Sequence, residues 1–264
     1  MVSTPARRKS SGVALCRWVI PYDCPATFKK TKYKPHLKKM WCIPPKQNAE
    51  FVARMEDVLG VYSRPYDPDY PVVCMDEKPY QLLDEYLEPI PMSDENHIVK
   101  YDCEYVRKGS CSIFMFTEPL GGWRKAHALS RRTCEDWAKQ MKWLLDEQYP
   151  NAKKVVLVMD NLNTHSTASF YKTFSAKEAF RLSQRLEIHY TPKHGSWLDM
   201  AEIELSALSI QCLLGVRIPT VDRLNEMLSA WDTARNANQK GINWQFSAAD
   251  ARIKLKHLYP IIKI

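Results

Sequence analysis

The chain has 264 residues, of which 45% are hydrophobic and 26% are charged, and its formal net charge is +8. This composition is typical of one large globular domain with a buried core, and it excludes a low-complexity or largely disordered chain. No apolar run approaches the roughly 18 residues that a membrane-spanning helix needs, and no convincing signal peptide is present, so we expect an intracellular protein.

The positive charge is concentrated near the N-terminus. Residues 1–50 hold eleven Lys and Arg against two acidic residues, which leaves the rest of the chain close to neutral. A basic block of this kind is an electrostatic footprint for a polyanion, most often nucleic acid, although an isolated basic run is also typical of a solvated, disordered arm. The candidate DNA contacts in this block are Lys29, Lys30, Lys32, Lys34, Lys38 and Lys39.

The eight cysteines predict neither a zinc site nor a disulfide framework. None of them forms a Cys-x-x-Cys pair, and no closely spaced histidine pair stands near them. Cys74 and Cys111 lie inside apolar runs, where cysteine is typically a small buried hydrophobic residue. The pattern favours a reducing cytoplasm.

The first part of the chain is poor in regular structure. Residues 1–27 show no periodicity and stay unassigned, as a disordered segment would. After the basic residues, positions 49–62 carry apolar side chains at helical spacing, and prolines at 65, 68 and 71 then mark a linker. We therefore expect a basic segment and linker helix over 28–64, and a folded domain over 70–260.

The domain alternates strands and helices. Strands are predicted at 71–77 (extending toward Leu83), 101–107, 111–117, 154–159 and 186–190, with a hairpin turn at Lys108-Gly109. Helices are predicted at 131–147, 166–184, 199–213, 220–235 and 247–257. Alternation after a hairpin indicates an α/β fold with a mixed sheet and helices on its faces. Parallel pairing would bring the C-terminal ends of the first and fourth strands together.

Two acidic residues, Asp76 and Asp160, follow apolar strand-like runs. A carboxylate at the end of a buried strand costs desolvation energy unless it is paired. Each aspartate could instead cap a turn, and Asp76 could pair with Lys78. With a glutamate from a helix, two such acids would form an oxygen cage for divalent cations of the kind that act in phosphoryl transfer.

The helix that follows offers two glutamates as the third acid. Ser196-x-x-Asp199 resembles a capping box that starts a helix. On that helix Glu202 lies roughly 85° to one side of the apolar stripe and Glu204 roughly 75° to the other, at about 100° per residue. Periodicity does not choose between them.

Several segments, taken together, resemble the DDE transposases of the mariner superfamily, in the bacterial insertion-sequence branch called the IS-six-thirty group. The segments are Met75-Asp76-Glu77, Val158–His165, Tyr190–Glu202, Trp41–Pro45 and Asp250–Leu255. The resemblance implies an RNase H-like fold, with residues 70–260 as the catalytic domain. It also implies a DNA strand transferase that uses Mg²⁺ or Mn²⁺, two ions in all, and acts in the bacterial cytoplasm on the nucleoid.

The resemblance places the catalytic and metal-binding triad on Asp76, Asp160 and Glu202. Glu202 is chosen because the third acid of the family follows an Asn-type position, here Asp199, by three residues. The implied supporting polar groups are Asn161 and His165, although His165 is also typical of a structural loop. Lys193 joins the candidate DNA contacts. The implied partners are double-stranded DNA, as transposon ends and target, and a second copy of the chain in the DNA complex.

The chain departs from the family pattern in ways that keep two alternatives open. Relatives begin with longer helix-turn-helix modules than the segment before residue 70 can hold. The loop 91–96 is acidic where basic residues and glycine are expected, and Asp199 adds a fourth acid. One alternative is a truncated remnant that binds DNA or inhibits a full-length copy without transposing. The other is a structure-selective nuclease on the same fold.

Overall fold

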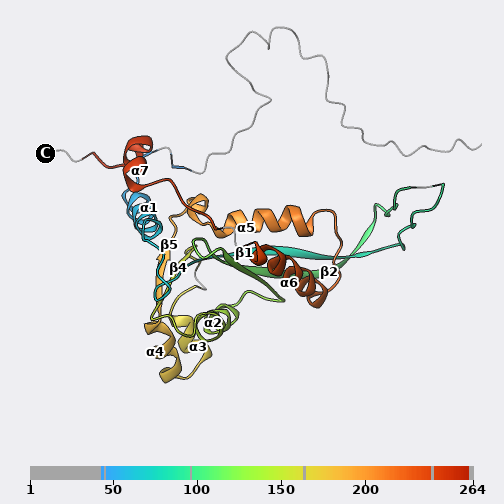
Figure 1. Ribbon diagram of the computed structural model, residues 1–264, viewed down its shortest axis with the longest axis horizontal. Helices are drawn as coiled ribbons and strands as arrows, with labels where there is room; N and C mark the ends of the chain where they lie inside the picture. Colours follow the sequence, from blue (N-terminus) through green and yellow to red (C-terminus); the bar gives the residue numbers. More distant parts are fainter. Residues whose placement is uncertain (1–42, 45, 96, 163–164, 239–240, 262–264) are drawn as a thin grey trace, which may run out of the picture. The chain divides into compact units, whose positions relative to one another are not determined.

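The computed structural model describes residues 43–44, 46–95, 97–162, 165–238 and 241–261 (Figure 1). The six N-terminal lysines and residues 1–27 lie outside the described residues, and so do five residues of the quoted motifs, Trp41, Cys42, Pro45, Asn163 and Thr164. In the part of the chain that is described, no helix combines the length and the apolar character needed to cross a membrane.

A five-stranded sheet lies at the centre of the fold, in the order β3-β2-β1-β4-β5 (Figure 1). The strands are β1 (Val72–Glu85), β2 (Tyr105–Glu118), β3 (Trp123–Leu129), β4 (Val155–Met159) and β5 (Leu186–Tyr190). β1 pairs antiparallel with β2 and parallel with β4, and β4 pairs parallel with β5. The prediction of a mixed sheet with its first strand beside the strand before Asp160 is therefore confirmed.

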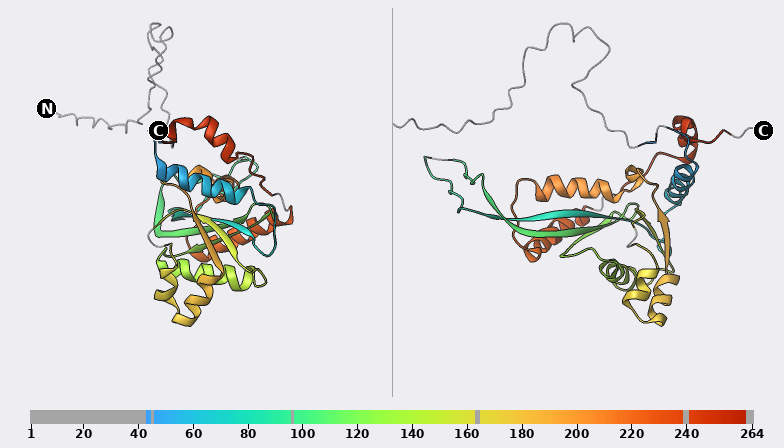
Figure 2. Two further views of the ribbon diagram at one scale, coloured as in Figure 1. Left: turned by 90° about the vertical axis from the view of Figure 1, so that its left-hand side faces the viewer. Right: turned by 180° about the vertical axis from the view of Figure 1, so that it is seen from behind.

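Helices cover both faces of the sheet (Figure 2). One face packs against α1 (Ala49–Tyr62), α5 (Ala201–Leu208) with its π-helical continuation Ser209–Leu213, α6 (Val221–Ala237) and α7 (Ala248–Lys254). The other packs against α2 (Cys134–Trp143) with its π-helical end Leu144–Gln148, α3 (Ala168–Thr173) and α4 (Ala176–Gln184). The predicted helix 49–62 is thus confirmed, and the helices predicted near 166–184 are α3 and α4.

The central strands divide their side chains between the two faces. Cys74 and Val156 point into the cluster that contains α1 and α5, whereas Val73, Met75 and Leu157 point into the cluster that contains α2. Successive side chains of a strand point to opposite faces, and here helices cover both. A strand of this kind reads as a continuous apolar run, which explains why β4 could be recognised in the sequence.

The predicted hairpin with a turn at Lys108-Gly109 is wrong. β2 continues through these residues and pairs with β1 on both sides of them. Gly109 has a φ of 103° and lies opposite Leu82, next to a shift in the strand register. The glycine therefore marks a bulge, for which a positive φ is as useful as it is in a turn. The chain turns later, between β2 and β3, and β3 was not predicted.

Side chains of α6 cover the edge strand β3. The amide oxygen of Asn225 accepts from the N–H of Ala128 at 2.8 Å, and that of Asn236 accepts from the N–H of Arg124 at 2.9 Å. Both amides also donate to the carbonyl of the same β3 residue. An edge strand normally leaves such groups free to pair with another chain, whereas here the helix satisfies them.

Candidate active site

Parallel pairing brings Asp76 and Asp160 to the same end of the sheet. Met75 of β1 pairs with Met159 of β4, and each aspartate is the next residue along its chain. β4 ends at Met159 while β1 continues, so Asp76 lies where β1 loses its parallel neighbour. Both aspartates are half-buried. The strand register thus places the two aspartates side by side, as predicted, but Asp76 lies within β1 and not at its end.

Glu202 reaches the same region from α5. It lines an open groove of about 400 Å³ whose opposite wall is formed by β1, beginning at Asp76. Burial is the main reason that the pKa of Asp76 rises to about 6, and the charges of Asp160 and Glu202 raise this pKa further. A hydrogen bond from the Glu77 N–H to Asp76 Oδ1, at 2.7 Å, acts in the opposite direction. The three acids therefore lie within electrostatic reach of one another.

Glu204, the rival third acid, lies in a different environment. Its side chain is 2% exposed and accepts from the Arg235 guanidinium at 3.0 and 3.1 Å. The guanidinium of Arg124, from β3, lies 3.4 Å away and is also buried. Glu204 thus belongs to an ion cluster that joins α5 to β3 and α6, whereas Glu202 lines the groove with Asp76.

The turn before α5 differs from the predicted capping box. Ser196–Leu198 forms one 3₁₀ turn, and α5 begins only at Ala201. Asp199 takes the capping role instead, because its Oδ1 accepts from the Ala201 N–H at 2.9 Å, while its Oδ2 is buried without a hydrogen-bond partner among the described residues. Burial raises the pKa of Asp199 well above its usual range, and the nearby charge of Asp76 adds to the effect.

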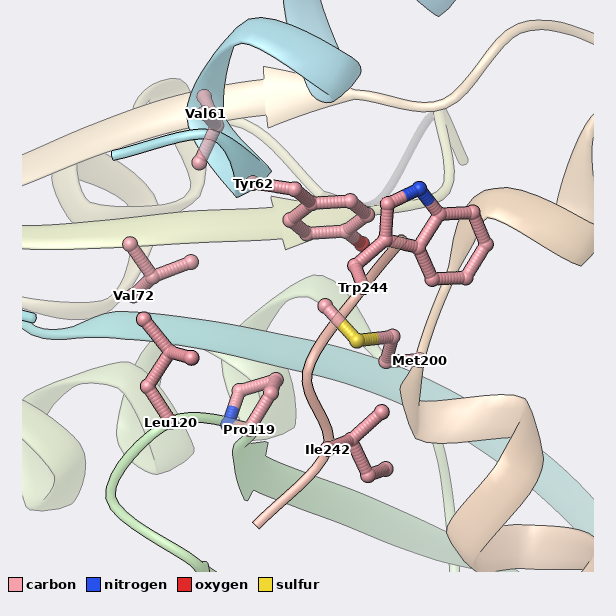
Figure 3. Close-up of a pocket in the computed structure, with 8 residues that line it drawn as sticks. All are labelled: Val61, Tyr62, Val72, Pro119, Leu120, Met200, Ile242 and Trp244. Carbon is pink, nitrogen blue, oxygen red and sulfur yellow. The ribbon is translucent and has the colours of Figure 1, made fainter. Parts of the chain in front are cut away.

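Tyr62 of α1 makes a hydrogen bond to this turn. Its ring lies beside Trp244 and Met200 (Figure 3). Its hydroxyl donates to the carbonyl of Leu198 at 2.6 Å, and its ring lies against that of Trp244, with 5.3 Å between centroids. The small cavity around them is apolar and carries no charged side chain. It is lined by Val61, Tyr62, Val72, Pro119, Leu120, Met200, Ile242 and Trp244. The cavity is therefore part of the packing that supports α5, and the groove is the candidate active site.

His165 links Asp160, at the end of β4, to Glu77, within β1. Its Nδ1 lies 3.1 Å from Asp160 Oδ1 and its Nε2 lies 2.9 Å from Glu77 Oε1. The ring stacks on Trp137 of α2, with 5.8 Å between centroids, and the His165 carbonyl accepts from the Tyr190 hydroxyl at 2.8 Å. Burial acts to lower the pKa of His165, but the hydrogen bonds to Asp160 and Glu77 outweigh it and raise the pKa to about 9. His165 is therefore a cation between two carboxylates at neutral pH.

The bridge includes a residue that the sequence did not single out. Glu77 follows Asp76 on β1, so its side chain points to the opposite face of the sheet. The sequence predicts that alternation, but it does not predict that His165 is the partner of Glu77 on that face.

The two remaining predicted site residues that the structure describes lie at the surface. Asn161 directly follows Asp160, and Lys193 lies in the segment between β5 and α5.

The three predicted acids fit a hard divalent cation by their chemistry. Asp76, Asp160 and Glu202 offer only carboxylate oxygens, which are the ligands that Mg²⁺ prefers. Among the described residues, no three His, Cys, Asp or Glu side chains already stand close enough together to hold an ion. The carboxylates would have to close around a cation, whose charge would remove the repulsion that they now exert on one another.

Comparison with protein families identifies the family to which this domain belongs. Residues 71–225, more than half of the chain, match the family described as DDE superfamily endonuclease. The chain belongs to this family. No curated protein matches it. The matched residues of this DDE superfamily endonuclease begin just before β1 and end in α6, so they include Asp76, Asp160 and Glu202.

Solved structures of a mariner transposase share the fold. The mariner Mos1 paired end complex with Mg is similar at a TM-score of 0.55 and 13% identity, over 89% of this chain and 70% of that chain. The Mos1 Strand Transfer Complex is similar at 0.51 and 14% identity, over 78% and 60%. This likeness confirms the predicted RNase H-like fold. The DDE superfamily endonuclease spans 60% to 70% of the length of these Mos1 chains.

Proposed function

We propose that this DDE superfamily endonuclease is a transposase that cuts DNA at the ends of an insertion sequence and joins the freed strand to target DNA. The observation that carries the proposal is the common position of the acids, with Asp160 at the end of β4, Asp76 beside it on β1, and Glu202 across the groove from Asp76 on α5. The reaction needs positioned phosphates and neutralised charge more than covalent chemistry from side chains. The proposed relatives are the bacterial insertion-sequence branch of the mariner superfamily.

The proposed ligands of the metal are Asp76, Asp160 and Glu202. Mg²⁺ or Mn²⁺, as two bound ions, would supply activation of the attacking oxygen and stabilisation of the leaving one. Mos1 paired end complexes have been solved with Mg and with Mn, which supports this choice of cation. His165 would fix the orientation of the Asp160 carboxylate through its second contact with Glu77. Asn161, beside Asp160, is the other proposed supporting group.

The proposed substrate is double-stranded DNA. The lysines of the N-terminal basic block and the exposed Lys193 would contribute contacts to its phosphates, which are largely independent of base sequence and weaken with salt. Two ends must be cut and joined together, so a pair of chains in the DNA complex is part of the proposal. The catalytic domain is assigned to residues 70–260, and the reaction to the bacterial cytoplasm and nucleoid.

The test is a cleavage and strand-joining assay on linear duplexes that carry the sequences flanking the coding region, with Mg²⁺ or Mn²⁺. Asp76→Asn and Asp160→Asn should each abolish cleavage while leaving the melting temperature and DNA affinity close to those of the unmodified protein. Asp222→Asn, a matched change at an exposed position of α6, should cleave normally. Normal cleavage by either active-site variant would refute the proposed site.

The same assay separates the alternatives. Cleavage at the element ends followed by joining supports a transposase. Metal-dependent nicking without preference for the ends would indicate a structure-selective nuclease on this fold. Binding of DNA without any cleavage would indicate a remnant that acts only by occupying DNA or by pairing with an active copy.

A further inference from the structure

The groove between β1 and α5 contains one basic side chain beside its acids. The charged residues that line it, within the described part of the chain, are Asp76, Glu77, Lys78 and Glu202. Lys78 lies two positions after Asp76 on β1, so both side chains point to the same face of the sheet. Two residues of a strand span about 7 Å. Lys78 is therefore a neighbour of the acidic site and lies further along the same groove.

The ammonium group of Lys78 is held by a neutral partner. Its Nζ donates to the hydroxyl of Ser209, in the π-helical continuation of α5, and that hydroxyl donates to the Leu205 carbonyl at 2.6 Å. None of the ion pairs found among the described residues includes Lys78, although Asp76 and Glu202 line the same groove. A lysine has three N–H donors and the serine takes one, so the other donors of the ammonium group can bind a further ligand.

A DNA strand in this groove would need such a cation. The side chains of Asp76 and Glu202 repel phosphate, and bound divalent ions would compensate for them only at the acidic end, while the side chain of Glu77 lies on the other face of the sheet against His165. An ammonium group is a compact point charge that binds phosphate oxygens well. Its place beyond Asp76 along β1 puts it beside the position of the cut, next to the acids that define that position.

We propose that Lys78 binds a phosphate of the DNA strand adjacent to the phosphate that is cut, and that Ser209 holds the ammonium group in place. The inference rests on the proposed function, since the acids define where the cut occurs. Lys78 acts here by binding and positioning the strand, and the ligand is a phosphodiester group independent of the base that it carries.

The first measurement is DNA affinity as a function of salt, with Ca²⁺ replacing Mg²⁺. Lys78→Gln should make the negative slope of log affinity against log salt shallower by about 1, and should lower affinity roughly 5- to 10-fold at 0.1 M salt. Lys78→Arg should keep the slope. The matched control is Lys154→Gln, because Lys154 is exposed and precedes β4, at the end of that strand opposite to Asp160. An unchanged slope in Lys78→Gln would overturn the inference.

The second measurement locates the phosphate. Single linkages near the cut are replaced by neutral methylphosphonates, and the loss of affinity is compared between proteins. With the unmodified protein one linkage beside the cut should show a clear loss, and with Lys78→Gln the same linkage should show none, because coupled partners are not additive. Lys154→Gln should still show the loss. If Lys78→Gln shows it too, the inference fails.

The two proposals can fail separately. If the unmodified protein cuts the element ends, but Lys78→Gln changes neither the salt dependence nor the effect of the methylphosphonate linkage, the transposase proposal stands and the proposed role of Lys78 is wrong. If the unmodified protein neither binds nor cuts these DNA ends, both are wrong. A melting temperature of Lys78→Gln close to that of the unmodified protein establishes that any change in affinity is not a consequence of unfolding.

Discussion

Replacing Glu204 with leucine should destabilise the protein strongly, whereas the same replacement of Glu202 should not. Glu204 and Arg124 both have side chains only 2% exposed, and Arg235 completes the ion cluster with a side chain that is 29% exposed. Removal of the carboxylate would leave two guanidinium groups near each other without their shared counter-charge. Arg235 can turn toward water, but Arg124 cannot.

The size of the effect follows from the burial of the cluster. Breaking a buried ion pair by removing one partner costs about 3–5 kcal/mol, and the partial exposure of Arg235 places the expected loss near the lower limit, at about 3–4 kcal/mol. For a domain of this size such a loss lowers the melting temperature by roughly 6–16 °C. Glu202 lines an open groove among like charges, so we expect the leucine variant there to remain within about 1 kcal/mol of the unmodified protein.

The assay is urea unfolding of both variants in EDTA, followed by circular dichroism. Metal-dependent cleavage is then measured at a temperature at which both variants are folded. Glu204→Leu should be less stable but able to cleave, and Glu202→Leu should be stable and unable to cleave. Equal stability losses at the two positions would refute the division of roles between a buried ion cluster and an active-site acid.

Two further predictions concern pH and have opposite signs. Hydrogen bonds from the Arg181 guanidinium, at 2.8 and 2.7 Å, are the main reason that the pKa of Asp146 falls to about 2. Asp146→Asn should therefore lower the free energy of unfolding by about 1–2 kcal/mol at pH 7, after allowance for solvent screening. This difference should vanish as the pH falls from about 4 to 2, because the carboxyl group of the unmodified protein then becomes protonated. A difference that stays constant in urea unfolding across that range would contradict the reasoning. Burial raises the pKa of Asp199, so the unmodified protein loses stability as the pH rises above about 4. Asp199→Asn keeps an acceptor for the Ala201 N–H but carries no ionisable group. The variant should therefore become increasingly more stable than the unmodified protein between pH 4 and pH 8 in EDTA. Equal melting temperatures of the variant and the unmodified protein at pH 8 would show that this carboxyl is not held in an unfavourable environment.

The sequence predicted those elements in which local pattern and burial agree. The five residues of β4 are all buried, so the apolar run and its end at Asp160 could be read directly. Parallel pairing of neighbouring strands then led to the meeting of Asp76 and Asp160, which the register bears out. The helix 49–62 was equally readable, since an apolar stripe at helical spacing packs into the core.

Other features depended on partners distant in the chain. Gly109 favours a turn and a bulge equally, and the choice is made by β1, which is long enough to pair with β2 on both sides of that glycine. β3 alternates small alanines with half-buried polar residues, so it lacks the β-branched composition of a strand. The environment of Glu204 depends on Arg124 and Arg235, which no periodicity on α5 can reveal.

The covering of β3 by α6 determines where the sheet can grow. With its amide groups engaged by Asn225 and Asn236, β3 offers an incoming peptide no ladder to extend. β2 runs further than β3, and its stretch Tyr105–Cys111 pairs only with β1 among the described strands. Added strands, whether from a misfolded copy or a bound peptide, would therefore find an open edge on that stretch of β2 and none on β3.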